Sequence, residues 1–225
     1  MSRPRMGRLQ VSKLLQADNI LERTGWHGMF LNAYVDDQWH NAETAQEVTS
    51  LLSEVIAALK HESDHPLGAV NPGTIAVLCF ADERFSHKDW GTNGAKGNLV
   101  IAVNKETGYG ALMWDWGPGD DQVWVSDNPE PPDFDPRVVA DPGYPLFHDP
   151  ASTLPIQKFR EVLEEFCFAG TGERPTGVRW VRSDPCGRRE DRLYPLDWGD
   201  TPSPEEFASW SRADPSSGAE FTAEE

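Results

Sequence analysis

The sequence predicts an α+β fold in which a mostly antiparallel sheet of about five or six strands packs against two main helices. The first observation is the helical spacing of apolar residues in two separate segments, one beginning near Thr44 and the other near Thr153. The second is a succession of short β-rich segments between them, divided by turn residues. Because these segments follow one another instead of alternating with helices, antiparallel pairing is favoured over a parallel sheet.

The N-terminal half of the predicted domain contains one strand, one helix and a meander. The strand is expected over residues 29–35, where apolar and polar residues alternate ahead of a polar turn. Thr44 and Glu47 form a capping box, and the apolar residues behind it recur at i, i+3, i+4 and i+7, so a helix is expected over roughly 44–61. Further strands are expected over residues 74–80, 85–90, 98–103, 109–116 and 122–126.

The C-terminal half begins with residues 127–150, which are rich in proline and aspartate and are expected to form a long surface excursion without regular structure. Thr153 is expected to cap the second helix, with Pro155 in its first turn and Gly170 after its end. Residues 177–181 are expected to form a closing strand. The chain therefore divides into an N-terminal appendage with a weak helical pattern (1–28), an α+β domain (29–182) and an irregular acidic C-terminal tail (183–225).

Composition indicates the class of partner. The formal net charge of −17 repels phosphate backbones and anionic lipid and attracts basic proteins, so we expect neither direct nucleic-acid binding nor membrane binding. The chain has no run of about 18 apolar residues and no apolar stretch at its N-terminus, which favours a cytoplasmic protein. Its three cysteines have no C-x-x-C spacing, which argues against a disulfide framework and a cysteine zinc site. No cofactor is expected.

An enzymatic alternative rests on the segment His61-Glu62-Ser63-Asp64-His65, which matches the H-E-x-x-H pattern. In that pattern two histidines one helical turn apart, here His61 and His65, hold zinc, and the glutamate, here Glu62, serves as general base. However, Pro66 disfavours helical geometry at His65, and no third ligand is evident downstream. We favour a charged helix end with exposed histidines, and therefore expect neither a metal site nor a catalytic residue.

An acidic and aromatic segment is the candidate binding site. Its members are Trp114, Asp115, Trp116, Asp120, Asp121 and Trp124. Tryptophans can anchor the buried centre of an interface, while carboxylates at its rim speed encounter and capture Arg or Lys side chains. The alternative is that the tryptophans pack the sheet and the aspartates occupy turns.

The C-terminal part of the predicted domain resembles the first immunity-protein family of bacterial polymorphic toxin systems. The family pattern is a helix started by proline, a phenylalanine near its end, a T-G-x-R-P-T turn and a short strand ending in tryptophan. The matching positions here are Pro155, Phe166, Thr171, Gly172, Arg174, Pro175, Thr176 and Trp180. The upstream order of strand, capped helix and meander is also similar, so the resemblance covers roughly residues 29–182.

The resemblance implies a non-enzymatic protein that is encoded beside a secreted toxin, often a nucleic-acid deaminase, and that occludes the toxin by tight binding. We interpret Pro155, Phe166, Gly172, Arg174, Pro175 and Trp180 as a fold-determining motif rather than as toxin contacts. The expected partner is a cognate toxin with a basic surface. Two alternatives stay open at this point: a zinc-dependent hydrolase using the H-E-x-x-H segment, and an acidic adaptor for another basic protein.

Overall fold

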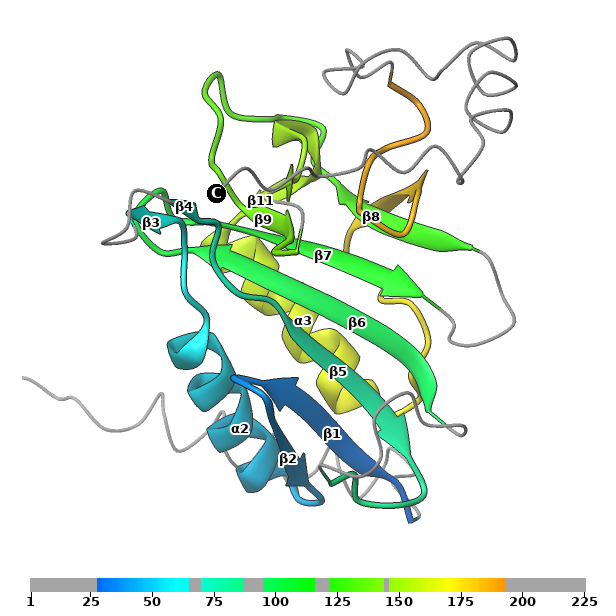
Figure 1. Ribbon diagram of the computed structural model, residues 1–225. Coiled ribbons are helices and arrows are strands. Elements are labelled where there is room, and N and C mark those ends of the chain that lie inside the picture. The colour runs from blue at the N-terminus through cyan, green and yellow to red at the C-terminus, as the bar shows by residue number, and fades with distance from the viewer. Residues whose placement is uncertain (1–27, 65–69, 87–94, 116–121, 144–145, 193–225) are drawn as a thin grey trace, which may run out of the picture. The chain divides into compact units, whose positions relative to one another are not determined.

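The computed structural model describes residues 28–64, 70–86, 95–115, 122–143 and 146–192 (Figure 1). Two helices and one 3-10 helix accompany the strands in this part of the chain: α2 (Ala45–Ala58), α3 (Ile156–Ala169) and η1 (Pro150–Ser152). The strands are β1 (Phe30–Val35), β2 (Gln38–Ala42), β3 (Ser63–Asp64), β4 (Val70–Asn71), β5 (Ala76–Ala81), β6 (Lys96–Asn104), β7 (Tyr109–Asp115), β8 (Val123–Asp127), β9 (Val139–Asp141), β10 (Leu146–Phe147), β11 (Thr153–Pro155) and β12 (Arg179–Ser183).

The main sheet has eight strands, and seven of them follow the order β12-β8-β7-β6-β5-β1-β2. The eighth, β11, pairs with one end of β7, beside the segment of β7 that pairs with β8. All of these pairs are antiparallel. The α+β class with a mostly antiparallel sheet is therefore confirmed, although the sheet has more strands than the sequence indicated.

One additional strand is β2, which returns along β1 through the turn at Asp36 and Asp37. Both aspartates have positive φ, 47° and 60°, as a two-residue hairpin turn requires. Val35 then faces Gln38 and Leu31 faces Ala42. The strand was missed because its residues show no alternation of apolar and polar types, and it lies at the edge of the sheet, where little of it is buried.

The first predicted helix is confirmed as α2, including its cap. The Thr44 hydroxyl accepts from the Glu47 amide at 3.2 Å, and the Glu47 carboxylate accepts from the Thr44 amide at 3.1 Å. The helix ends at Ala58, before the expected position, because the backbone of Lys60 pairs with Thr74 instead. Its amide donates to the Thr74 hydroxyl at 2.9 Å, and its carbonyl accepts from the Thr74 amide at 2.9 Å.

The second predicted helix is present as α3, but the expected cap at Thr153 is wrong. Thr153 lies in β11, opposite Ala111 of β7, and its hydroxyl donates to the Pro150 carbonyl at 2.7 Å. The helix begins after Pro155, which makes no side-chain cap hydrogen bond. Gly170 ends the helix with φ 67°, as expected for a left-handed C-terminal position.

Two further predictions on local structure need correction. The excursion over residues 127–150 is not wholly irregular, because β9 and β10 form a short antiparallel pair within it. Next to this pair, the amide of His148, just after β10, donates to the carbonyl of Val138, just before β9, at 2.8 Å. In the predicted strand over 85–90, Phe85 and Ser86 are not extended sheet residues, and positions 87–90 lie outside the described residues.

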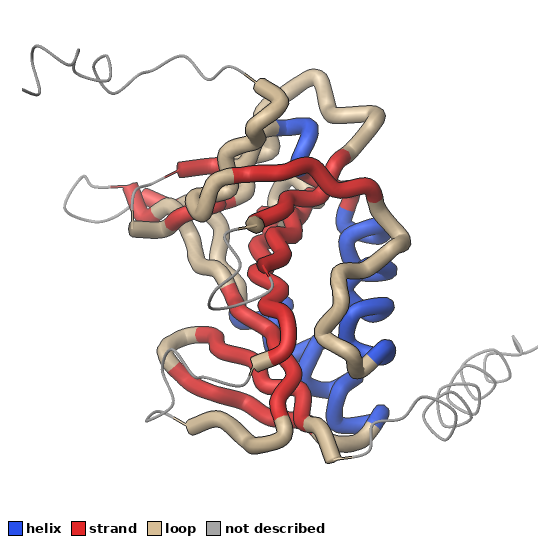
Figure 2. Tube along the Cα trace, turned by 90° about the vertical axis from the view of Figure 1, so that its right-hand side faces the viewer, coloured by secondary structure: helices blue, strands red, loops and turns tan. Residues whose placement is uncertain are grey.

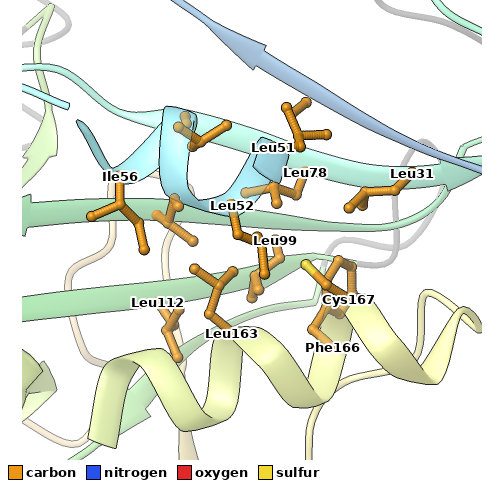
Figure 3. Close-up of a cluster of buried hydrophobic side chains, with 14 of the residues drawn as sticks. Leu31, Leu51, Leu52, Ile56, Leu78, Leu99, Leu112, Leu163, Phe166 and Cys167 are labelled. Carbon is orange, nitrogen blue, oxygen red and sulfur yellow. The ribbon is translucent and has the colours of Figure 1, made fainter. Parts of the chain in front are cut away.

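Both helices cover the same face of the main sheet (Figure 2). The close-up in Figure 3 shows Leu52 of α2 and Leu163 of α3 converging on the strand residues Leu78, Leu99 and Leu112. These strand leucines are fully buried, and each such side chain contributes about 1.5–3 kcal/mol relative to an exposed one. In the part of the chain that the structure describes, neither helix has the length and apolar character needed to cross a bilayer.

After β12 the described chain continues into an extension that folds back against the main sheet and includes Asp191. Arg189 explains the extension: it is 5% exposed, and its guanidinium contacts Asp127 at 3.0 Å and Asp191 at 2.8 Å. It also donates to the Ala151 carbonyl at 3.0 Å. An isolated bridge pairs Ser183 with Arg189, so the chain folds back after β12. The remainder of the predicted tail and the predicted N-terminal appendage up to residue 27 lie outside the described residues.

Candidate functional site

The described members of the predicted acidic and aromatic patch do not share one face of the sheet. Trp114 and Trp124 face each other across β7 and β8, and both side chains contact the core beneath the helices. Asp115 follows Trp114 in β7, so its side chain projects from the opposite face of the sheet. There its carboxylate accepts a hydrogen bond from the Asn98 amide group at 3.0 Å.

Trp114 is a core residue. It is 7% exposed, and its indole N–H donates to the Gly172 carbonyl at 3.1 Å. Trp124 is half-buried, and the Arg174 guanidinium stacks 4.0 Å above its ring centroid. Trp114 is therefore packed in the core, whereas Trp124 packs against Arg174 and stays half-buried, so contact of either ring with a partner stays a prediction. Trp116, Asp120 and Asp121 lie outside the described residues, so their part in binding stays a prediction.

The T-G-x-R-P-T turn, residues 171–176, connects α3 to the sheet through an unusually close backbone approach. Gly172 has φ 74°, and a Cβ at this position would lie 1.9 Å from the Lys96 carbonyl oxygen. Gly97 lies opposite, where a Cβ would lie 1.9 Å from the Gly172 carbonyl oxygen. Only glycine fits at both positions, so this contact brings the turn against the start of β6.

The second half of the same turn is held by Glu165 of α3. Its carboxylate accepts hydrogen bonds from the Thr176 amide at 2.6 Å, the Thr176 hydroxyl at 2.9 Å and the Gly177 amide at 2.8 Å. Trp180 adds an indole hydrogen bond to the Pro175 carbonyl at 2.7 Å. These contacts explain how the turn directs the chain from α3 into β12.

The remaining motif residues at the helix also have packing roles. Phe166 is 1% exposed, and its ring lies 5.5 Å from that of Phe80 in β5. Pro155 is exposed and lies at the junction of β11 and α3. Together with the contacts of the turn, these positions support the interpretation of the motif as fold-determining. No contact to a toxin is carried onto them.

The H-E-x-x-H segment does not form the helical arrangement that zinc binding requires. His61 and Glu62 follow the end of α2 at Ala58, and Ser63 is already in β3. Glu62 is engaged by Arg137, whose Nε donates to its carboxylate at 2.8 Å, and this hydrogen bond lowers the pKa of Glu62. His65 lies outside the described residues. Within the described ranges, no group of three or more His, Cys, Asp or Glu side chains could hold a metal ion.

A hollow lies between α2 and the edge strand β2. It comprises two adjoining cavities of about 500 Å³ and about 270 Å³, which share His40, Leu51 and Glu54. The larger cavity also includes Glu47, and the smaller one includes Asp36. Helix α2 itself contains no Lys or Arg. Sequence reasoning missed this groove because it depends on β2, which carries no periodic signal.

Fold and geometry together describe an acidic α+β protein with a mostly antiparallel sheet, whose signature turn is explained by packing. The family of Immunity protein Imm1 matches residues 36–182, and the chain belongs to this family. The family resemblance inferred from the Pro155-to-Trp180 pattern is thereby confirmed. Neither the curated proteins nor the solved structures gave a match.

Proposed function

We propose that this protein is the immunity protein of a cognate bacterial toxin, which it neutralises by binding the toxin domain and covering its active site, without catalysis of its own. Membership of the Imm1 immunity protein family is the observation that carries the proposal. The toxin is proposed to have a basic surface and to be a nucleic-acid deaminase, and the encounter is proposed to occur in the cytoplasm.

The charge of the protein supports a basic partner. A net charge of −17 raises the rate of encounter with a cationic protein, while affinity depends on a few desolvated anchor residues. Several described basic side chains are already paired with carboxylates, including Lys60 with Asp36 at 3.1 Å and Arg84 with Glu43 at 2.9 Å. These pairs leave fewer free cations on the described surface to offset its carboxylates, which supports attraction to a basic partner.

Co-expression is the direct test of the immunity role. The toxin domain encoded in the adjacent reading frame is expressed from an inducible promoter, alone and together with the full chain. We expect growth to be restored only in the second case, and an unrelated toxin serves as the control for specificity. Cells that die despite soluble immunity protein would contradict the proposal, whereas binding without protection would indicate an adaptor instead.

A kinetic experiment tests the electrostatic part of the proposal. Association of the purified proteins is measured from about 0.05 to about 0.5 M salt, across which the Debye length shortens several-fold. We expect the association rate to fall at least tenfold, with a much smaller change in the dissociation rate. An association rate that does not respond to salt would refute the role of charge while leaving the immunity role intact. Inhibition of base deamination in the same mixture tests the proposed toxin class.

A further inference from the structure

We propose that the tip of the proline-rich excursion, residues 130–135, is an anchor of the toxin-binding surface, in which Phe134 and its flanking carboxylates receive a cationic side chain of the partner. This inference rests on the proposed immunity function and names a part of the surface that carries it. The tip is separate in sequence from the Trp114 segment, and hydrogen bonds hold the excursion on both sides of it.

The excursion leaves the sheet through an anchored position. At Asn128 the amide donates to the Ala151 carbonyl at 2.7 Å, and the side chain donates to the Thr153 carbonyl at 2.8 Å. Asn128 itself is only 7% exposed, so both hydrogen bonds are shielded from water. The chain therefore departs from β8 in a defined direction rather than as a loose loop.

The excursion returns through a second anchored position. Asn104, at the end of β6, donates from its side chain to the Pro136 carbonyl at 2.9 Å, and the Thr107 hydroxyl donates to the same carbonyl at 3.1 Å. Four prolines, at positions 129, 131, 132 and 136, restrict the backbone between these anchors. Binding to this tip would consequently lose little backbone entropy.

Arg137, the basic residue that follows the tip in the sequence, is already engaged by other groups. Arg137 donates from Nε to the Glu62 carboxylate at 2.8 Å, and its guanidinium lies 3.6 Å from the centroid of the Phe147 ring. Its amide donates to the Asp135 carboxylate at 2.8 Å, which shapes the turn after Phe134. Arg137 therefore holds the base of the tip, and its charge is partly neutralised there.

The tip itself presents an aromatic ring among carboxylates. Phe134 is 47% exposed, and its ring meets Tyr109 edge-on at a centroid distance of 5.7 Å. Among the described residues, it is the one large hydrophobic side chain that is exposed to solvent. Asp133 and Asp135 flank it in sequence, Glu130 lies four residues before it, and all three are exposed. Among the described residues the Glu130 and Asp133 carboxylates have no hydrogen bond or ion pair, whereas the Asp135 carboxylate accepts from the Arg137 amide and lies 3.8 Å from the Arg137 guanidinium.

This combination selects one kind of partner. An arginine or lysine can place its aliphatic stem or its charge against the aromatic ring while the carboxylates accept its N–H groups. Phosphate backbones and anionic membranes carry the same sign of charge as the tip and are repelled. A basic protein surface is therefore the occupant that matches both the ring and its surroundings.

Two variants of the full chain test the inference by titration against the toxin domain encoded in the adjacent reading frame. Phe134→Ala is expected to weaken binding about 30-fold or more, as the loss of an anchor residue does. Asp133→Lys is expected to slow association about threefold or more and to reduce its salt dependence. Glu164→Lys makes the same change of charge at an exposed position on α3 and is expected to bind like the wild type.

The outcomes separate this inference from the function on which it rests. If wild-type protein binds and protects while Phe134→Ala and Asp133→Lys bind equally well, the tip is not an anchor and the immunity role stands. If Asp133→Lys and Glu164→Lys slowed association equally, the inference would also be overturned, because the association rate would then respond to overall charge and not to the tip. A wild-type chain that does not bind would refute both. The thermal unfolding midpoint of each variant is also measured. A midpoint equal to that of the wild type shows that a loss of binding is not caused by a loss of fold.

Discussion

The substitution Gly172→Ala tests whether the close approach of the T-G-x-R-P-T turn to β6 stabilises the domain. An alanine here must adopt φ 74° and would place its Cβ 1.9 Å from the Lys96 carbonyl oxygen. The left-handed backbone alone costs about 1–2 kcal/mol. The two backbones must also separate by roughly an ångström, since Cβ contacts below 3.0 Å essentially never occur.

That separation would break the hydrogen bond from the Trp114 indole to the Gly172 carbonyl. A buried donor left without a partner costs about 1–3 kcal/mol, so the total loss is expected to be about 4 kcal/mol. Gly108 provides a matched control, because it has φ 75° and a Cβ there would meet nothing within 4 Å. Gly108→Ala is therefore expected to lose only the backbone contribution, about 1–2 kcal/mol.

Urea unfolding of the three proteins, followed by circular dichroism and tryptophan fluorescence, measures the two losses in the free energy of unfolding. We expect Gly172→Ala to be less stable than Gly108→Ala by about 2 kcal/mol or more. Equal losses for the two variants would show that the contact with Lys96 has no energetic weight, and the explanation of the turn would be wrong.

Substitutions at three further positions test other parts of the structure by the same unfolding assay. Glu165→Ala removes the acceptor of three hydrogen bonds and should cost about 1–3 kcal/mol, whereas Glu165→Gln should cost less; equal losses would contradict the acceptor role. Arg189→Ala should cost about 3–5 kcal/mol, because it leaves the largely buried Asp127 carboxylate with one cation fewer; a loss below 1 kcal/mol, roughly a surface value, would refute this. Burial lowers the pKa of His148 to about 4 from 6.5, so its contribution is complete above pH 6.5 and is lost as pH falls towards about 4, by up to about 3 kcal/mol. His148→Gln should remove that part of the pH dependence, and an unchanged dependence would show that His148 is not its source.

The sequence by itself determined the features that depend on local signals. The capping box of Thr44 and Glu47 located the start of α2, because both partners lie within one helical turn. Gly170 located the end of α3 for a similarly local reason. The pattern from Pro155 to Trp180 identified the family, and the structure explains that pattern by a glycine contact, a carboxylate and an indole that all act on one turn.

Other features were decided only by the tertiary structure. β2 has little buried surface and β11 has only three residues, so neither shows an apolar–polar alternation, and only their backbone pairing in the folded protein makes them strands. The candidate patch separated for a related reason: Trp114 and Asp115 are adjacent in the chain, but successive residues of a strand face opposite sides. Folding also decided which aromatic residues are buried, because burial depends on partners that are distant in the sequence. Phe134 became a candidate only when the structure showed it exposed between the two anchored ends of the excursion.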